Sequence, residues 1–388
     1  MIAPLLSLSA FLFLLCHLLQ VQQWSRGFRG AFLQDGATPK AASANPAEVN
    51  PAEVSIVLPV RNEAATLPQL LHDLAAGTSM PKEVIVVDDD SVDGTLEAIA
   101  AMGSLPFPLH SMSNPGKGKK PGLSAGIRAA AHPWVIQVDA DVRVGPHFVQ
   151  SIAQHLRAHG PQTDMLLLPL RLAYSSHGAP QSTFEHLQAL DFAAMQGWAV
   201  AAARRQRPAM ASGGAWVWRK SAFPHEGLRP DLASGDDVFA LASLIQRGDG
   251  ARVGWCGQPD SMASAAPMPD FQTLLDQRIR WGAKSAAYPK ALSEARRVAT
   301  IIAGVHALGA ALLIVNPLAG GGFWLAKAAI DMTYTHLVGR AYGLFNGMGA
   351  GRRWGTLALL AAVHPMFIIT TLLLMPFRKA PWKGRAAA

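Results

Sequence analysis

The sequence predicts an α/β fold, with a mostly parallel sheet that carries helices on both faces and is flanked by transmembrane helices. Short β-branched runs such as VSIVLPV and EVIVVD alternate with helical stretches in the first half of the chain. This alternation is typical of a parallel sheet. Apolar stretches of about 20 residues, long enough to cross a bilayer, lie on both sides of this region.

The first apolar stretch, MIAPLLSLSAFLFLLCHLLQ, contains no charged residue. A cleaved signal peptide is the alternative, but it requires a basic region before the apolar core. The first basic residues, Arg26 and Arg29, come after that core. We therefore expect residues 1–22 to form a transmembrane anchor, with the chain that follows it in the cytoplasm. Residues 23–53 are rich in Ala and Pro and are expected to be a linker.

The C-terminal region, residues 298–378, contains three further apolar candidates. The middle candidate is the weakest, because it includes Lys327, Asp331 and Arg340 and charges are costly in hydrocarbon. The basic tail, residues 379–388, is expected to be cytoplasmic, which requires an even number of crossings after a cytoplasmic domain. One candidate is then interfacial or re-entrant, so we expect two or three membrane helices. This pattern indicates a multi-pass protein of the inner (cytoplasmic) membrane, with the domain between the apolar segments facing the cytoplasm.

The net charge of +8 arises from 34 basic and 26 acidic residues. Such a balance suits nucleic acid, an anionic membrane surface or a phosphorylated substrate. The basic residues flank apolar segments, which favours a membrane over nucleic acid as a partner. Examples are Arg296, Arg297, Arg352, Arg353 and Arg378. The two cysteines, Cys16 and Cys256, allow neither a disulfide framework nor a zinc-binding spacing.

Acidic clusters follow two of the expected strands. Asp88, Asp89 and Asp90 follow one strand, and Asp139 and Asp141 follow the run WVIQV. Ligands of parallel sheets bind at the carboxyl ends of the strands. Residues at positions i and i+2 point to the same side, so Asp139 and Asp141 suit a hard cation such as Mg²⁺ or Mn²⁺ that holds phosphate oxygens. A turn that caps a helix is the alternative.

Six motifs occur in order: VSIVLPVRNE, VIVVDDDSVDGT, GKGKKPGLSAGI, VIQVDADV, SGDDVFAL and QRIRW. This series resembles the family 2 glycosyltransferases, which have the Rossmann-like GT-A fold. The resemblance implies a GT-A domain over residues 54–290. With the flanking apolar segments, the chain is similar to the membrane-bound branch, which includes cellulose, chitin and hyaluronan synthases. It resembles bacterial carotenoid and glycolipid glycosyltransferases more closely than these synthases.

The resemblance also assigns residues to a nucleotide-sugar donor. In this reading Asp89 holds the uracil ring, Lys119 binds the diphosphate, and a Gln-x-x-Arg-Trp segment closes over the diphosphate and contacts the acceptor. The residues assigned to the donor in this way are Pro59, Arg61, Glu63, Asp89, Lys119, Asp139, Gly213, Gly214, Gln277, Arg280 and Trp281. The run PGLSAG departs from the family's usual Ala-Leu-Asn, which puts a donor contact from Ser124 in doubt.

Two adjacent acids, Asp236 and Asp237, begin a helical pattern. Acids are favourable in the first turn of any helix, so an ordinary helix start is one interpretation. The resemblance instead implies that Asp237 is the general base and that Asp236 replaces the usual Glu beside it. An inverting transfer requires such a carboxylate, because the acceptor hydroxyl loses its proton as it attacks the anomeric carbon. The metal ligands implied are Asp139 and Asp141.

These features predict an inverting hexosyltransferase that moves a sugar from a nucleotide-sugar, expected to be a UDP-sugar, to a membrane-embedded lipid. Polymer synthases of the family usually carry more transmembrane helices than the four candidates found in this chain. The small number of candidates favours the transfer of a single sugar. A short processive polysaccharide synthase is the first alternative. A noncatalytic nucleotide-sugar-binding membrane protein is the second alternative, and it is disfavoured because every expected catalytic carboxylate is present.

Overall fold

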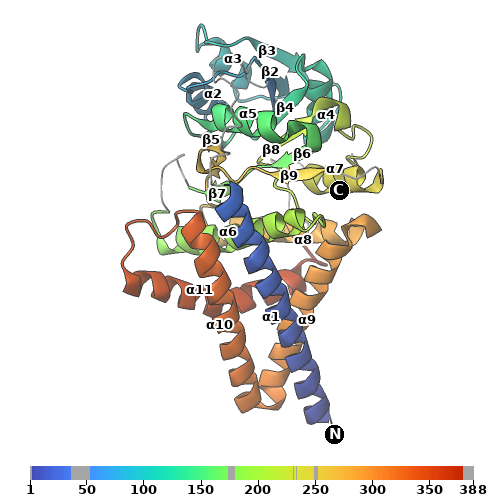
Figure 1. The fold of residues 1–388 in the computed structure, drawn as a ribbon, viewed down its shortest axis with the longest axis vertical. Coiled ribbons are helices and arrows are strands. Elements are labelled where there is room, and N and C mark those ends of the chain that lie inside the picture. The colour runs from blue at the N-terminus through green and yellow to red at the C-terminus, as the bar shows by residue number, and fades with distance from the viewer. Residues whose placement is uncertain are drawn as a thin grey trace. The chain divides into compact units, whose positions relative to one another are not determined.

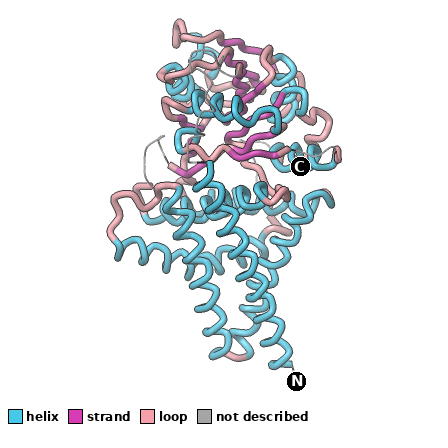
Figure 2. Tube along the Cα trace, in the orientation of Figure 1, coloured by secondary structure: helices cyan, strands magenta, loops and turns pink. Residues whose placement is uncertain are grey.

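The structure is a computed structural model that describes residues 2–35, 53–173, 180–229, 231–232, 234–248 and 252–378. The chain forms two compact units (Figure 1). The helical unit comprises Met1–Arg29, Pro180–Ala209 and Met268–Pro381. The sheet unit comprises Gly30–Ala179, Met210–Pro267 and Trp382–Ala388. All strands in the described part of the chain belong to the sheet unit (Figure 2).

A seven-stranded sheet with the order β3-β2-β1-β4-β8-β6-β9 forms the centre of the sheet unit. Its strands are β1 (Val54–Val60), β2 (Glu83–Asp88), β3 (Leu109–Ser113), β4 (Trp134–Val138), β6 (Met165–Leu167), β8 (Ala215–Arg219) and β9 (Val253–Trp255). The first four strands in this order are parallel, β8 is antiparallel to both of its neighbours, and β9 is parallel to β6. A second sheet has the order β5-β10-β7. Its strands are β5 (Val142–Val144), β7 (Leu170–Leu172) and β10 (Ala263–Ala265). The mostly parallel sheet confirms the predicted fold class.

The helices of the sheet unit connect these strands. They are α2 (Leu67–Ala75), α3 (Thr95–Ala100), α4 (Lys119–Ala129), α5 (Phe148–His159) and α7 (Asp236–Gln246). Helix α4 packs closely on β1 and β2, and Gly126 permits the approach. A Cβ atom at Gly126 would lie 2.5 Å from Cγ1 of Val57 and 2.9 Å from Cγ2 of Val87. The absence of a side chain at Gly126 therefore allows the second half of α4 to lie close to the sheet.

The helical unit contains the long apolar helices. Its helices are α1 (Ile2–Asp35), α6 (Thr183–Arg204), α8 (Phe271–Ala283), α9 (Ser293–Val315), α10 (Pro317–Ala341) and α11 (Ala350–Leu374). In the described residues, three segments are long and apolar enough to cross a membrane: Pro4–Gly30, Lys290–Val315 and Ala350–Leu374. Helix α10 does not meet this standard, and it corresponds to the candidate with internal charges.

Two charged residues of α10, Lys327 and Asp331, are paired within the helical unit. Nζ of Lys327 lies 2.5 Å from Oδ2 of Asp331, and Nε2 of His17 on α1 lies 2.8 Å from the other oxygen, Oδ1. The Lys327 side chain is 3% exposed. Pairing and hydrogen bonding offset the cost of burying such groups. These contacts explain how a helix with internal charges packs among apolar ones.

Two predicted boundaries differ from the structure. Helix α1 continues to Asp35, so the first part of the predicted linker is helical, because Trp24 and Phe28 are buried in the helical unit. The predicted domain over residues 54–290 is also divided, because α6 and α8 belong to the helical unit. The rest of the linker and the basic tail lie outside the described residues.

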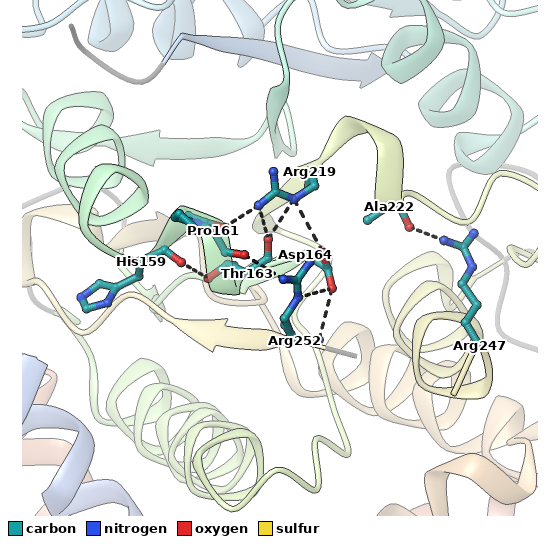
Figure 3. Close-up of polar contacts among 9 residues, drawn as sticks. His159, Pro161, Thr163, Asp164, Arg219, Ala222, Arg247 and Arg252 are labelled. Carbon is teal, nitrogen blue, oxygen red and sulfur yellow. Dashed lines mark hydrogen bonds and ion pairs between the residues drawn. The ribbon is translucent and has the colours of Figure 1, made fainter. Parts of the chain in front are cut away.

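The half-buried carboxylate of Asp164 links residues at the ends of three strands of the sheet unit, β6, β8 and β9. Figure 3 shows the guanidinium groups of Arg219, which ends β8, and Arg252, which precedes β9, directed at Asp164, which precedes β6. Arg252 donates two hydrogen bonds of 3.1 and 2.8 Å to the two oxygens, and Nε of Arg219 lies 3.6 Å from Oδ1. Burial alone would raise the pKa of Asp164, but the hydrogen bonds and charge of Arg252, aided by Arg219, lower it below its usual value.

Replacing Asp164 by Asn is expected to destabilise the protein by about 1–3 kcal/mol at pH 7, since it removes charged hydrogen bonds at a mostly buried site. The depressed folded-state pKa means that this stabilisation is present above the unfolded-state pKa and is lost as the pH falls through the folded-state value. The variant's melting temperature in detergent should therefore approach that of the wild type in acid. The control is Asp231→Asn, which breaks an exposed pair with Arg229 and should change the melting temperature little.

Candidate functional site

Several predicted residues lie at one edge of the sheet unit. Strands β1, β2 and β4 are parallel, so their carboxyl ends share this edge. Strand β8 runs antiparallel to β4 and begins at the same edge, where the amide of Asp139 donates to the carbonyl of Gly214 at 3.0 Å. The fold thus brings together segments that are far apart in the sequence, as the acidic clusters at strand ends predicted.

Asp89 is fixed at the end of β2 and is 4% exposed. Its oxygens accept hydrogen bonds from the amide of Gly118, at 3.0 and 3.1 Å. The guanidinium of Arg61 donates to the backbone carbonyls of Asp89 and Asp90. Arg61 therefore supports the turn that carries Asp89, while Asp89 links the end of β2 to the loop before α4.

Asn114 was not predicted from the sequence, yet it contacts the same carboxylate. Its Nδ2 donates to Oδ1 of Asp89 and to the carbonyl of Gly118, each at 2.9 Å. Its Oδ1 accepts from the amide of Gly116 at 3.2 Å. An Asn directly before a Pro-Gly loop is the available sequence signal, since its side chain can bond the backbone of that loop.

Lys119, at the start of α4, connects the predicted metal-binding and catalytic acids. Its Nζ lies 2.7 Å from Oδ1 of Asp139 and 3.0 Å from Oδ2 of Asp236. It also donates to the carbonyl of Gly213 at 3.1 Å. Burial alone would lower the pKa of Lys119, but the two carboxylates outweigh burial and raise it above its usual value. Lys119 is therefore a fixed cation at neutral pH.

The two acids of α7 have different environments. Asp236 is 8% exposed and faces Lys119. Asp237 is half-buried and accepts hydrogen bonds from the amide of Gly213 at 3.1 Å and from the amide of Val238 at 2.8 Å. A Cβ at Gly213 would lie 3.3–3.4 Å from both acids, so a side chain there would crowd them. Gly213 therefore lies directly against the two acids of α7.

The carboxylates at the end of β4 fit a divalent cation. Burial raises the pKa of Asp139; Lys119 opposes this effect, and the nearby charges of Asp141 and Asp236 add to it. Asp141 is exposed. Mg²⁺ typically binds one or two carboxylates and completes its shell with water and phosphate oxygens. No group of three or more His, Cys, Asp or Glu side chains suited to a metal occurs in the described ranges. Asp139 and Asp141 supply two carboxylates, a number that this mode of binding uses.

Gln137 is a second residue that was not predicted. It is fully buried in β4 and donates from Nε2 to Oδ1 of Asp139 at 3.0 Å. A polar residue inside the apolar run WVIQV is a visible signal, because alternation along the strand directs it to the same side as Asp139. It holds one carboxylate oxygen in place.

The remaining predicted residues have other surroundings. Pro59 is half-buried in β1 opposite Val87. The carboxylate of Glu63 accepts from the hydroxyl of Thr66 at 2.6 Å, at the start of α2. Gln277, Arg280 and Trp281 lie on α8, which belongs to the helical unit.

Lys120 differs from its neighbour Lys119. It is 4% exposed, and its Nζ donates to the carbonyls of Arg229 and Leu232 at 2.6 and 2.7 Å. Its ammonium also lies 5.2 Å from the centre of the Phe239 ring on α7. Lys120 therefore links the start of α4 to the loop before α7 by hydrogen bonds to Arg229 and Leu232.

Known proteins with similar sequences or folds include several sugar transferases. Residues 55–205 match the model of glycosyl transferase family 2. The 4,4'-diaponeurosporenoate glycosyltransferase of Staphylococcus haemolyticus is 31% identical over 140 residues, 35% of each chain. The undecaprenyl-phosphate 4-deoxy-4-formamido-L-arabinose transferase of Shewanella sediminis is 35% identical over 104 residues, 26% of this chain and 31% of its own. The matched segments span about a third of these relatives.

A similar solved structure is a mannosyltransferase from Pyrobaculum calidifontis in complex with GDP-Man and Mn²⁺. It aligns with a TM-score of 0.52 at 17% identity and covers 96% of this chain and 99% of its own. This similarity confirms the predicted GT-A fold. The residues at the edge of the sheet unit therefore lie in a fold of this type, and residues 55–205 are similar to glycosyl transferase family 2.

Proposed function

We propose that this protein is an inverting glycosyltransferase that moves a sugar from a nucleotide-sugar to a membrane-embedded lipid. The observation that carries the proposal is the contact of Lys119 with Asp139 and Asp236. A single cation thus joins a carboxylate suited to a metal–diphosphate complex and a carboxylate of the catalytic helix. Asp89 is assigned to the base of the nucleotide, and Asp237 is assigned to the acceptor hydroxyl.

The donor is a UDP-sugar, held through its base and its diphosphate. Asp89 is an acceptor suited to the N–H of uracil, with Gly118 and Asn114 fixing its oxygens. The N-terminus of α4 and the ammonium of Lys119 attract the diphosphate. Asp139 and Asp141 hold Mg²⁺ or Mn²⁺, which supplies positive charge to the diphosphate when bound.

Asp237 is the general base of the transfer. The acceptor hydroxyl gives its proton to Asp237, and its oxygen forms a bond to the anomeric carbon from the face opposite the diphosphate. The bond from that carbon to the diphosphate oxygen breaks, and the electron pair leaves with the nucleoside diphosphate. One displacement inverts the anomeric configuration. The amides of Gly213 and Val238 orient the carboxylate of Asp237 for this step.

The acceptor is a membrane lipid with a free hydroxyl group. Three apolar helices in the described residues are long enough to reach it in a bilayer. Two similar proteins are, by their names, a transferase that acts on diaponeurosporenoate and one that acts on undecaprenyl phosphate. We place residues 1–22 and 298–378 in the inner membrane, the domain over residues 54–290 on its cytoplasmic side, and the tail, residues 379–388, beside it.

The proposal is tested by incubating membranes that contain the protein with a panel of labelled UDP- and GDP-sugars. Label in a discrete species of the lipid extract, with an anomeric configuration opposite to that of the donor, is expected for UDP-sugars. Label in insoluble polymer would instead indicate a processive polysaccharide synthase. A preference for GDP-sugars would overturn the assignment of uracil to Asp89.

Replacing Asn114 by Ala is expected to weaken UDP binding about tenfold, which corresponds to the loss of one hydrogen bond to a charged group. Asp89 keeps its bond from Gly118 but loses the side chain that fixes Oδ1. Titration calorimetry measures the dissociation constant. Ser113→Ala, at the exposed neighbouring residue, is the matched control and should leave the constant unchanged. Unchanged binding in Asn114→Ala would remove Asn114 from the nucleotide site.

A further inference from the structure

A buried arginine organises the helix that carries the Gln-x-x-Arg-Trp segment. Arg278 on α8 is 9% exposed, although it is not one of the three signature residues. Its Nη1 donates to Oε1 of Gln277 at 2.7 Å, and its Nη2 donates to Oδ2 of Asp191 at 2.8 Å. Its guanidinium carbon lies 4.5 Å from the centre of the Trp281 ring. One side chain therefore contacts two of the three signature residues.

The signature residues differ from Arg278 in exposure. Gln277 and Trp281 are half-buried, so each retains surface that a ligand can reach. They are four positions apart on α8 and share one face of the helix. Arg278 restrains both from the protein side, because a planar guanidinium donates in its plane and stacks on an aromatic ring through its face.

Helix α6 holds Arg278 in turn. Asp191 supplies the carboxylate, and the ring centre of the next residue, Phe192, lies 6.3 Å from that of Trp281. The second oxygen of Asp191 lies 3.3 Å from Nε2 of His364 on α11. Burial alone would raise the pKa of Asp191, but Arg278 and His364 lower it well below its usual value. The carboxylate is thus charged, and three helices of the helical unit meet at it.

We propose that Asp191 and Arg278 are positioning residues that set the side chains of Gln277 and Trp281 for the lipid acceptor. This inference rests on the proposed function for the acceptor. It assigns a task to α6, whose Asp191 and Phe192 brace Arg278 and Trp281. The acceptor touches Gln277 and Trp281, while Asp191 acts only through Arg278.

Asp191→Asn removes the charge but keeps the size of the side chain. We expect kcat/KM for the lipid acceptor to fall about 10- to 100-fold, as small displacements of substrate-positioning groups do. The KM for the acceptor should rise more than kcat falls. Asp191→Glu keeps the charge and should recover part of the loss. Arg278→Met should give a similar defect, and the double variant Asp191→Asn with Arg278→Met should be no worse than the single variants.

The matched control is Asp270→Ala, which removes the N-cap of the same helix. Asp270 accepts from the amide of Thr273 at 2.8 Å, and its loss costs about 1 kcal/mol of helix stability. It leaves the contacts of Arg278 in place, so kcat/KM should change less than threefold. An equal defect in this control, or normal kinetics in Asp191→Asn, would overturn the inference.

A second readout does not depend on sugar transfer. In detergent-solubilised protein labelled with 5-fluorotryptophan, the ¹⁹F resonance that disappears in Trp281→Phe belongs to Trp281. Asp191→Asn should shift this resonance, whereas Asp270→Ala should not. An unmoved resonance contradicts the positioning role even if the wild type transfers no sugar. A shifted resonance in a protein without transferase activity would instead mean that the proposed function is wrong and the network is real.

Discussion

Asp237→Asn is expected to lower kcat for sugar transfer about 10²- to 10⁴-fold, the usual contribution of a general base. The amide keeps the size of the carboxylate but cannot accept the proton of the acceptor hydroxyl. The dissociation constant for UDP should stay within about threefold of the wild type, because Asp89 and Lys119 are unchanged. Single-turnover transfer and calorimetric titration measure the two effects separately.

Asp231→Asn, an exposed acid on the segment before α7, is the control for this experiment and should retain full activity. If Asp237→Asn lost nucleotide binding and transfer to the same degree, Asp237 would be part of the donor site and the base would be another group. Loss of binding alone would have the same meaning.

Asp139→Ala is expected to remove the metal-dependent part of nucleotide binding, with a loss of affinity of about 100-fold in the presence of Mn²⁺. The reason is that the end of β4 would keep only the exposed carboxylate of Asp141 for the cation. Residual binding should no longer respond to EDTA. Titration of the variant with UDP, with and without metal, gives both numbers.

Asp90→Asn provides the comparison, since it removes an exposed acid from the cluster after β2 while Asn tolerates the positive φ of 55° at that position. Its response to metal should equal that of the wild type. Full activity of the wild-type protein in EDTA would exclude the metal site at Asp139 and Asp141.

The edge of the sheet unit was largely predictable because strand ends can be read from the sequence. Apolar runs that end in acids placed Asp89 and Asp139 at the carboxyl ends of parallel strands, and the structure puts them there. Asn114 and Gln137 were missed because their roles depend on which backbone and carboxylate groups come within hydrogen-bonding distance. Hydrogen bonds of this kind, made to the acidic residues by other side chains, can be identified only when the fold is known and not from the order of the motifs.

The helical unit was less predictable, for a different physical reason. Hydropathy detects segments that face lipid, but α6 is buried against protein and is built from small residues such as Ala189, Ala193 and Gly197. The sequence of α6 therefore gives no strong apolar signal that it packs in the same unit as the long apolar helices. The same applies to the end of α1, where Trp24 and Phe28 are buried beyond the apolar stretch. Arg278 was not predicted because it occupies a variable position of the Gln-x-x-Arg-Trp signature, whose specified residues are Gln277, Arg280 and Trp281.

The most direct test of the central claim compares labelled lipid formed by membranes containing wild-type protein and Asp237→Asn, matched for protein amount. With a labelled UDP-sugar and Mn²⁺, the wild type is expected to place label in one extractable lipid, and Asp237→Asn should leave at most about one per cent of it. No labelled lipid from the wild type with any donor, or equal labelling by both proteins, would contradict the account.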